Sequence, residues 1–251
     1  MDKLISSQAR IGRNTVLGLG SIIMDDVVIG NDCCIGNYVV IYPGTQIADN
    51  VRIDDFCVIG KKPLRSPRSI FSDEENLKPA CIRECCLIGT GVIIYAQAEI
   101  GRDNLIADFA TIRENVEIGD FNIIGRNVTI ENYVRIGDRN KFETNCYITA
   151  YSQVEDYCFI APCVATSNDN YLGRDKERFK HFRGITIRRG GRIGVNATVL
   201  PGKTIEPDGV VAGGSTVTRD VSAEDVWMGS PARKKGKVPV TQLLINNLDK
   251  K

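Results

Sequence analysis

Residues 82–160 carry the clearest pattern in the chain and read IRECCLIGTGVIIYAQAEIGRDNLIADFATIRENVEIGDFNIIGRNVTIENYVRIGDRNKFETNCYITAYSQVEDYCFI. In steps of six, a large apolar residue recurs at Ile82, Ile88, Ile94, Ile100, Ile106, Ile112, Ile118, Ile124, Ile130, Ile136, Phe142, Ile148, Val154 and Ile160. No window repeats apolar residues with the period of a helix. A short fixed period is typical of solenoids, whose units bury their apolar faces by stacking on their neighbours. The pattern therefore predicts the short strands of a parallel β-helix.

The same period continues on both sides of this block. Further anchors occur at Ile11, Leu17, Ile23, Ile29, Ile35, Ile41, Ile47, Ile53, Ile59, Ile187, Ile193, Val199, Ile205, Val211 and Val217. Glycines that directly follow anchors, such as Gly12 and Gly30, indicate corners that need positive φ or close backbone approach. We therefore expect one β-helical domain over residues 1–234. A tail follows at residues 235–251, in which TQLLINNL is expected to form a short helix, and Trp227 and Met228 are expected to cover the last coil.

Two excursions interrupt the period, at residues 61–81 and 161–186. Loops of this length are uncommon in compact domains unless they serve binding or catalysis. The first is rich in proline and basic residues. It is either a solvated loop or a cap on a neighbouring subunit, or else an arm that contacts phosphate through Lys61, Lys62, Arg65 and Arg68.

Composition excludes several classes of protein. The chain has 251 residues, of which 43% are apolar and 25% charged, and its net charge is +1, so it has no general attraction for nucleic acid or an anionic membrane. It begins without a signal-like segment and contains no run of eighteen apolar residues. We therefore expect a cytoplasmic protein with no nucleic-acid or membrane partner.

The nine cysteines are better explained by packing than by disulfides or metal. Five of them, Cys33, Cys57, Cys86, Cys146 and Cys158, occupy the small site four residues after an anchor, which favours buried reduced thiols. Cys81, Cys85 and Cys86 supply half of a zinc-like spacing, with no second half. The single histidine, His181, excludes a three-histidine site within one chain. We expect no metal.

Four segments add a resemblance to a known family. They are TSNDN at 166–170, GGRIGVNATVLPGKTI at 190–205, VAGGSTVTRDV at 211–221 and MGSPARK at 228–234. Together with the six-residue repeat, they make the chain resemble the hexapeptide-repeat acyltransferases over nearly its whole length. It looks most like the enzymes that acylate the amino group of nucleotide-linked deoxyamino sugars, such as the anthrose-pathway N-acyltransferase.

The resemblance implies an all-β, left-handed parallel β-helix with three hexads per coil, so that residues eighteen apart are stacked. It also implies a homotrimer that binds acetyl-CoA or another acyl-CoA in the groove between adjacent prisms. The acceptor would be a dTDP- or UDP-linked amino sugar of surface polysaccharide biosynthesis. The leading functional hypothesis is therefore an acyl-CoA-dependent N-acyltransferase.

Transfer of an acyl group from a thioester to an amine requires that a proton be removed from the amine, and a carboxylate can accept it. Asp108 is the first candidate, as the base or as a carboxylate that orients the sugar, and Glu131 is the second. Each has a structural alternative, because Asp108 is equally suited to a solvated coil face and Glu131 to pairing with Arg113 one coil below. Glu114 and Glu143 are held in reserve.

Other residues are candidates for binding. Arg113, Asn168, Asp169 and Asn170 are candidates for the sugar, although Asn and Asp also support turns without any ligand. His181 is a candidate base, but its position favours a surface role. By the resemblance, coenzyme A would contact Arg192, Gly194, Lys203, Ala212, Gly213 and Arg233.

Two other functions stay open: O-acetylation of a sugar or of serine, and a non-catalytic β-helical scaffold. The sequence leaves undecided which sugar, which amino position and which acyl group are used.

Overall fold

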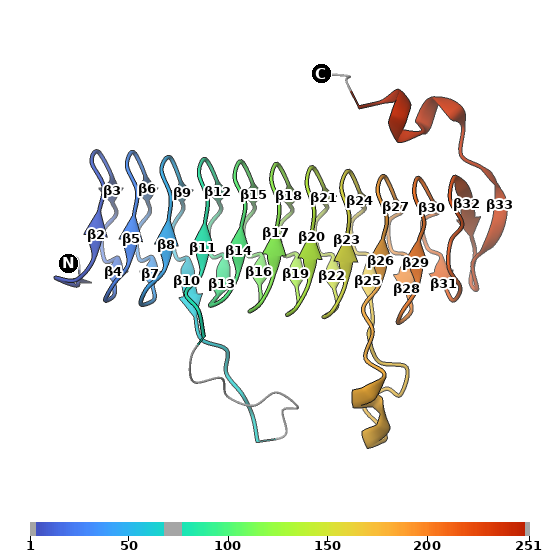
Figure 1. Cartoon of the computed structure of the whole chain (residues 1–251), viewed down its shortest axis with the longest axis horizontal. Helices are drawn as coiled ribbons and strands as arrows, with labels where there is room; N and C mark the ends of the chain where they lie inside the picture. Colours follow the sequence, from blue (N-terminus) through green and yellow to red (C-terminus); the bar gives the residue numbers. More distant parts are fainter. Residues whose placement is uncertain (1–3, 68–76, 249–251) are drawn as a thin grey trace.

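Each six-residue unit forms a two-residue strand and a four-residue corner in the computed structural model, which describes residues 4–67 and 77–248. Residues eighteen apart in the unbroken repeats pair in parallel register, as Ile82 does with Ile100 and Ile100 with Ile118. Three such units complete one coil, and the coils stack into an elongated prism with three flat faces (Figure 1). The predicted all-β parallel β-helix is confirmed.

The faces are named here A, B and C. Within the described residues, face A contains β1 (Leu4–Ile5), β4 (Ile22–Ile23), β7 (Val40–Ile41), β10 (Val58–Lys61), β13 (Ile93–Tyr95), β16 (Thr111–Ile112), β19 (Thr129–Ile130), β22 (Tyr147–Ile148), β25 (Ala165–Thr166), β28 (Thr198–Val199) and β31 (Thr216–Val217). Face B contains β2 (Arg10–Ile11), β5 (Val28–Ile29), β8 (Gln46–Ile47), β11 (Cys81–Ile82), β14 (Glu99–Ile100), β17 (Glu117–Ile118), β20 (Arg135–Ile136), β23 (Gln153–Val154), β26 (Thr186–Ile187) and β29 (Thr204–Ile205).

Face C contains β3 (Val16–Leu17), β6 (Cys34–Ile35), β9 (Arg52–Ile53), β12 (Leu87–Ile88), β15 (Leu105–Ile106), β18 (Ile123–Ile124), β21 (Lys141–Phe142), β24 (Phe159–Ile160), β27 (Arg192–Ile193), β30 (Val210–Val211), β32 (Asp225–Met228) and β33 (Arg233–Lys237). The chain passes from A to B to C and back to A. The turns between these faces are called the A–B, B–C and C–A corners.

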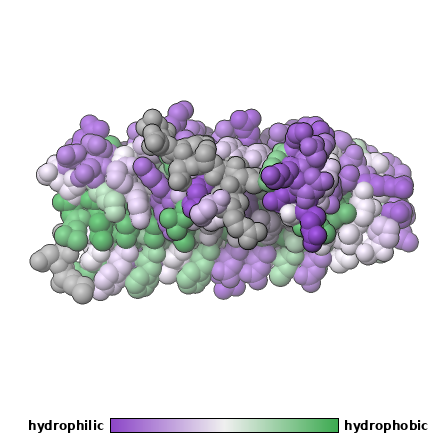
Figure 2. All heavy atoms as spheres, turned by 90° about the horizontal axis from the view of Figure 1, so that it is seen from below, coloured by the Kyte–Doolittle hydropathy of each residue, from purple (hydrophilic) through white to green (hydrophobic). Residues whose placement is uncertain are grey.

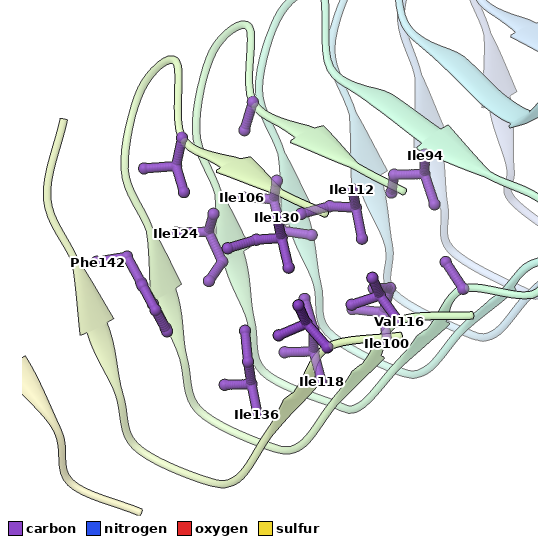
Figure 3. Close-up of a cluster of buried hydrophobic side chains, with 14 of the residues drawn as sticks. Ile94, Ile100, Ile106, Ile112, Val116, Ile118, Ile124, Ile130, Ile136 and Phe142 are labelled. Carbon is purple, nitrogen blue, oxygen red and sulfur yellow. The ribbon is translucent and has the colours of Figure 1, made fainter. Parts of the chain in front are cut away.

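Anchors from the three faces meet along the axis and form the core. Figure 3 shows Ile94, Ile112 and Ile130 in one column, with Ile100, Ile118 and Ile136 in another. Neighbouring strands lie about 4.8 Å apart, so each anchor packs directly on the next. Phe142 replaces the usual isoleucine and is fully buried. The five cysteines predicted to be inward are buried, and all nine cysteines are free thiols.

The corners combine two backbone requirements. A side chain at Gly30 would place its Cβ 2.7 Å from the carbonyl carbon of Ala48 in the next coil, so this glycine is needed for close approach. The left-handed backbone conformation falls two residues later and is taken mostly by other residue types. Asp32, with φ of 55°, and Asn50, with φ of 58°, are examples on the same corner.

The second excursion begins later than the sequence indicated, because the repeat continues through β25. Thr166 occupies the anchor position and is buried. Its hydroxyl accepts a hydrogen bond from the Thr149 N–H at 2.8 Å and donates one to the Tyr147 carbonyl at 3.1 Å. These bonds satisfy a polar group where an aliphatic side chain was expected. We name residues 62–80 loop 1 and residues 167–185 loop 2, which contains the short 3-10 helix η1 (Lys176–Lys180).

The C-terminal end closes the prism. Trp227 packs against the core, as expected, whereas Met228 is 47% exposed and does not cover it. The tail forms η2 (Val240–Gln242) and η3 (Leu244–Asn246) rather than one helix. It returns over the solenoid, where the Leu244 N–H donates to Asp208 at 3.0 Å. No helix in the described ranges is long and apolar enough to cross a membrane.

Candidate functional site

Both loops leave the prism at the A–B corner. Loop 1 connects β10 on face A to β11 on face B, and loop 2 connects β25 on face A to β26 on face B. Figure 1 shows them projecting from the same side of the solenoid. Figure 2, which views this side, shows mostly polar residues over loop 2 and more apolar ones over the N-terminal coils. The corner between the loops follows β13, β16, β19 and β22 and forms the candidate site.

A column of functional side chains lies along this corner, one residue after each anchor: Tyr95, Arg113, Glu131 and Thr149. The Arg113 guanidinium lies 4.9 Å from the centroid of the Tyr95 ring, and its Nη1 is 3.6 Å from Oε2 of Glu131. The structural alternative stated for Glu131, pairing with Arg113 one coil below, is therefore observed. The Glu131 side chain keeps 21% of its surface exposed, so a ligand can reach it.

Tyr147 supports Glu131 from β22. Burial raises the pKa of the Tyr147 hydroxyl, and the negative charge of nearby Glu131 raises it further. The phenol therefore stays protonated at neutral pH. Glu131 thus lies beside the Arg113 cation and near the Tyr147 hydroxyl while still open to solvent.

Glu114 follows Arg113 on the same corner and connects loop 1 to the prism by a hydrogen bond with Arg65. Its side chain is fully buried. It accepts hydrogen bonds from Arg113 Nε at 2.9 Å and from Arg65 Nη2 of loop 1 at 2.8 Å. Burial opposes ionisation of Glu114, but the hydrogen bond and charge of Arg113, together with Arg65, lower its pKa below the ordinary value. Arg65 is thus an internal anchor of loop 1, while Arg68 lies outside the described residues.

Asp108 lies elsewhere, on the C–A corner, so the chain does not bring it together with Glu131. Its Oδ1 accepts the Thr90 N–H from the preceding coil at 3.0 Å. The same contact, from a side-chain oxygen to the backbone eighteen residues earlier, is made by Asn31, Asn37, Asp49, Asp55, Asp120, Asp138 and Asp156. This repetition gives Asp108 a structural contact that does not depend on a ligand.

Asp169 organises loop 2 from within. It accepts hydrogen bonds from the N–H groups of Tyr171 at 2.8 Å and Gly173 at 2.9 Å, and from Arg178 at 3.0 Å. Burial acts to raise the pKa of Asp169, but these bonds lower it overall. The Asn168 carbonyl accepts the Arg183 N–H at 3.2 Å and Asn170 is exposed. Asp169 therefore stabilises a turn, which is the structural alternative stated for this residue.

His181 follows η1 at the outer part of loop 2. Its side chain is exposed and its ring stacks on Tyr171 with centroids 5.9 Å apart. It lies in loop 2, whereas Glu131 and Arg113 belong to the column on the prism corner. This position agrees with the surface role expected from the sequence.

The residues expected to contact coenzyme A fall into four places. Gly194, Ala212 and Gly213 share the C–A corner, and a Cβ at Gly194 would lie 2.5 Å from the Gly213 nitrogen. Arg192 lies on face C under the tail, with Nη1 3.3 Å from Gln242 Oε1. Lys203 lies on the A–B corner beyond loop 2, and Arg233 is exposed on β33. One chain alone does not bring them together.

Sequence reasoning missed Tyr95 and Tyr147, and it held Glu114 only in reserve. A signal was available for Tyr95, because Tyr95, Arg113 and Glu131 are spaced by eighteen. Among the residues that the structure describes, no group of three His, Cys, Asp or Glu side chains is placed to hold a metal ion.

Comparison with known proteins supports the fold independently. A family model described as bacterial transferase hexapeptide (six repeats) matches residues 8–43, 26–61 and 97–132. The structure of LpxA, a UDP-N-acetylglucosamine acyltransferase from Bacteroides fragilis, is similar with a TM-score of 0.55 and 16% identity, covering 94% of this chain and 72% of that one. The Arabidopsis UDP-N-acetylglucosamine acyltransferase is similar with a TM-score of 0.50 and 19% identity, covering 98% and 75%. The chain therefore contains hexapeptide repeats and has the fold of these acyltransferases.

Proposed function

We propose that the protein is an acyl-CoA-dependent N-acyltransferase that acylates the amino group of a dTDP- or UDP-linked deoxyamino sugar. The observation that carries this proposal is the placement of both loops on one corner, on either side of a solvent-accessible carboxylate that is paired with Arg113 and lies near Tyr147. The shared fold with UDP-N-acetylglucosamine acyltransferases supports it.

Glu131 is the proposed proton acceptor. The amine nitrogen attacks the thioester carbonyl carbon, its proton passes to the Glu131 carboxylate directly or through water, and a tetrahedral oxyanion forms. Backbone N–H groups at the coil corners are suited to stabilise that oxyanion. Collapse breaks the carbon–sulfur bond, and the departing thiolate takes up the proton. The products are an amide and free coenzyme A, without a covalent enzyme intermediate or a metal.

A homotrimer is part of this proposal, because the candidate residues occupy different corners. Adjacent prisms would bring the C–A corner of one subunit, with Asp108, Gly194 and Gly213, to the A–B corner of the next. The donor would then lie in the groove between them, with its thioester near Glu131. In this arrangement Asp108 would orient the sugar from the neighbouring subunit, in addition to its contact with Thr90.

The position of His181 favours an amine acceptor over a hydroxyl. A hydroxyl is a weak nucleophile until a base removes its proton, and histidine is the side chain most often used for that purpose. The single histidine of this chain lies in loop 2, stacked on Tyr171. A carboxylate such as Glu131 suffices for an amine, which is the better nucleophile once deprotonated.

A thiol-release assay tests the proposal directly. Acetyl-CoA is offered with dTDP- and UDP-linked 3-amino and 4-amino sugars, and each is paired with its hydroxyl counterpart. We expect release with one amino sugar and none with the matching hydroxyl sugar. Release with the hydroxyl sugar would instead establish O-acyl transfer. No release across the panel and several acyl chain lengths, combined with no binding of coenzyme A, would support a scaffold.

A further inference from the structure

A pocket of about 450 Å³ opens beside the candidate site, on the face B side of the A–B corner. It extends along the coils between the two loops. Lys78, at the end of loop 1, lines one end, and its carbonyl accepts the Gln97 N–H at 2.9 Å. Tyr151 lines the opposite end. Gly184 of loop 2 packs directly against the Tyr151 backbone, since a Cβ at Gly184 would overlap the Tyr151 carbonyl carbon. The pocket therefore spans the interval between the loops.

Two tyrosines form a platform in this pocket. The rings of Tyr133 and Tyr151, eighteen residues apart, stack with centroids 5.3 Å apart and an interplanar angle of 1°. Both residues adopt the left-handed backbone conformation, with φ of 60° and 65°, in which bulky residues are rare. Aromatic faces provide apolar area with little conformational entropy to lose, and they suit the C–H face of a ring-shaped ligand.

Amide side chains complete the polar lining, contributed by Gln97, Asn115 and Gln153. The Oε1 atom of Gln97 is buried and has no hydrogen-bond partner among the residues that the structure describes. A buried acceptor without a partner costs free energy, so a ligand or water donor is needed at this position. A lining of amides beside aromatic rings can recognise several hydroxyl groups at once, because amides both donate and accept.

The positive and negative side chains that line the pocket are equal in number, so their charges balance. Lys78 and Arg135 are balanced by Glu99 and Glu117, and Arg135 Nε lies 3.4 Å from Glu117 Oε2. A phosphate-binding site would instead present an excess of positive charge. The lining therefore favours an uncharged polyhydroxylated ring over a phosphate group.

We propose that this pocket binds the sugar ring of the acceptor, with the ring stacked against the Tyr133–Tyr151 platform and its hydroxyl groups on Gln97, Asn115 and Gln153. This assignment rests on the proposed function. Tyr133 follows Glu131 by two residues, so their Cα atoms are at most about 7 Å apart. Glu131 does not line the pocket itself. In this assignment the amino group extends from the edge of the pocket toward the Glu131 carboxylate.

Kinetics of Tyr151→Ala and Gln97→Asn test the assignment. Asn tolerates the backbone at position 97, where φ is 63°, but shortens the reach of the amide. We expect each variant to raise KM for the amino sugar about tenfold or more, with kcat within about threefold, as for lost uniform binding. Tyr38→Ala is the matched control, because Tyr38 stacks on Phe56 at 5.5 Å on the C–A corner with φ of 54°. Unchanged KM in both pocket variants would overturn the assignment.

Binding without a donor separates this inference from the proposed function. Saturation-transfer NMR with UDP-N-acetylglucosamine and a dTDP-linked amino sugar reports which ligand protons contact the protein. We expect transfer to the ring protons, lost in Tyr151→Ala and retained in Tyr38→Ala, even if no acyl transfer is found. Acyl transfer without any dependence on Tyr151 would contradict the pocket assignment while leaving the activity in place. Circular-dichroism melting confirms that each variant is folded.

Discussion

Replacement of Glu114 by glutamine tests whether the buried ion pair fastens loop 1. The change leaves Arg65, with a side chain 8% exposed, and Arg113 beside a neutral amide. Removing one partner of a buried pair typically costs about 3–5 kcal/mol. Arg113 keeps Glu131 at 3.6 Å, so most of the cost falls on Arg65 and we expect about 3 kcal/mol, the low end of that range.

Two measurements report this effect. Urea denaturation gives the change in stability, and limited trypsin digestion after Arg65 reports opening of loop 1, because local opening exposes the chain to cleavage. Glu117→Gln is the matched control, since its pair with Arg135 is exposed, with side chains 56% and 70% accessible. Exposed pairs contribute about 0–1 kcal/mol.

The stabilisation should also depend on pH. The pKa of Glu114 is lowered in the folded protein, so its contribution is complete above the unfolded value of 4.5 and is lost as pH falls through the folded pKa. The difference between wild type and Glu114→Gln should therefore shrink below about pH 4.5. Equal, small effects of the Glu114 and Glu117 substitutions at neutral pH would refute the proposed anchoring.

Three further outcomes are expected. His181→Asn retains most activity, and a loss near 10²-fold would assign the base role to the histidine. Asp108→Asn keeps the melting temperature, because its amide oxygen still accepts the Thr90 N–H. The same change lowers turnover of the assembled enzyme about tenfold or more. Unchanged turnover would leave Asp108 with only its structural contact to Thr90. Thiol titration of the native protein should modify exposed cysteines first, since burial raises the pKa of Cys57 to about 11 and of Cys158 to about 12, and fast modification of these two would contradict the packing. The exposed cysteines are Cys34, Cys85 and Cys163.

The fold was predictable because a single physical constraint repeats along the chain. Every coil needs a large apolar residue at the same inward position, and the six-residue period records that need directly. The stacking of Arg113 below Glu131 followed from this period only together with the three hexads per coil that the resemblance implied. Handedness and coil size came from the resemblance instead, since a period alone specifies neither.

The site was harder to predict because one anchor is a threonine. Counting anchors from Ile82 to Ile160 gives fourteen, which places the two loops on different corners. Including Thr166 gives fifteen, or five whole coils, and places both loops on the A–B corner. The hydroxyl of Thr166 can be buried because the backbone of Thr149 and of Tyr147 supplies its hydrogen-bond partners. The sequence alone does not reveal these partners.

Asp108 illustrates a second limit of sequence reasoning. An acidic residue in the central coils suggests catalysis, yet the same position in other coils carries Asp or Asn that cap the corner below. Comparison of the positions that follow each anchor by two residues would have indicated this role. Glu114 was underrated for the opposite reason, because its partner Arg65 lies 49 residues away in loop 1.

The most direct test of the account is the turnover of Glu131→Gln compared with Glu155→Gln. Both residues follow an anchor by one position, but Glu131 lies on the A–B corner between the loops and Glu155 on the B–C corner, where its Oε1 is 2.6 Å from Arg188 Nη1. We predict that Glu131→Gln lowers kcat with the amino sugar by about 10²-fold, whereas Glu155→Gln stays within about threefold of wild type. Full activity in Glu131→Gln would contradict the placement of the chemistry at this corner.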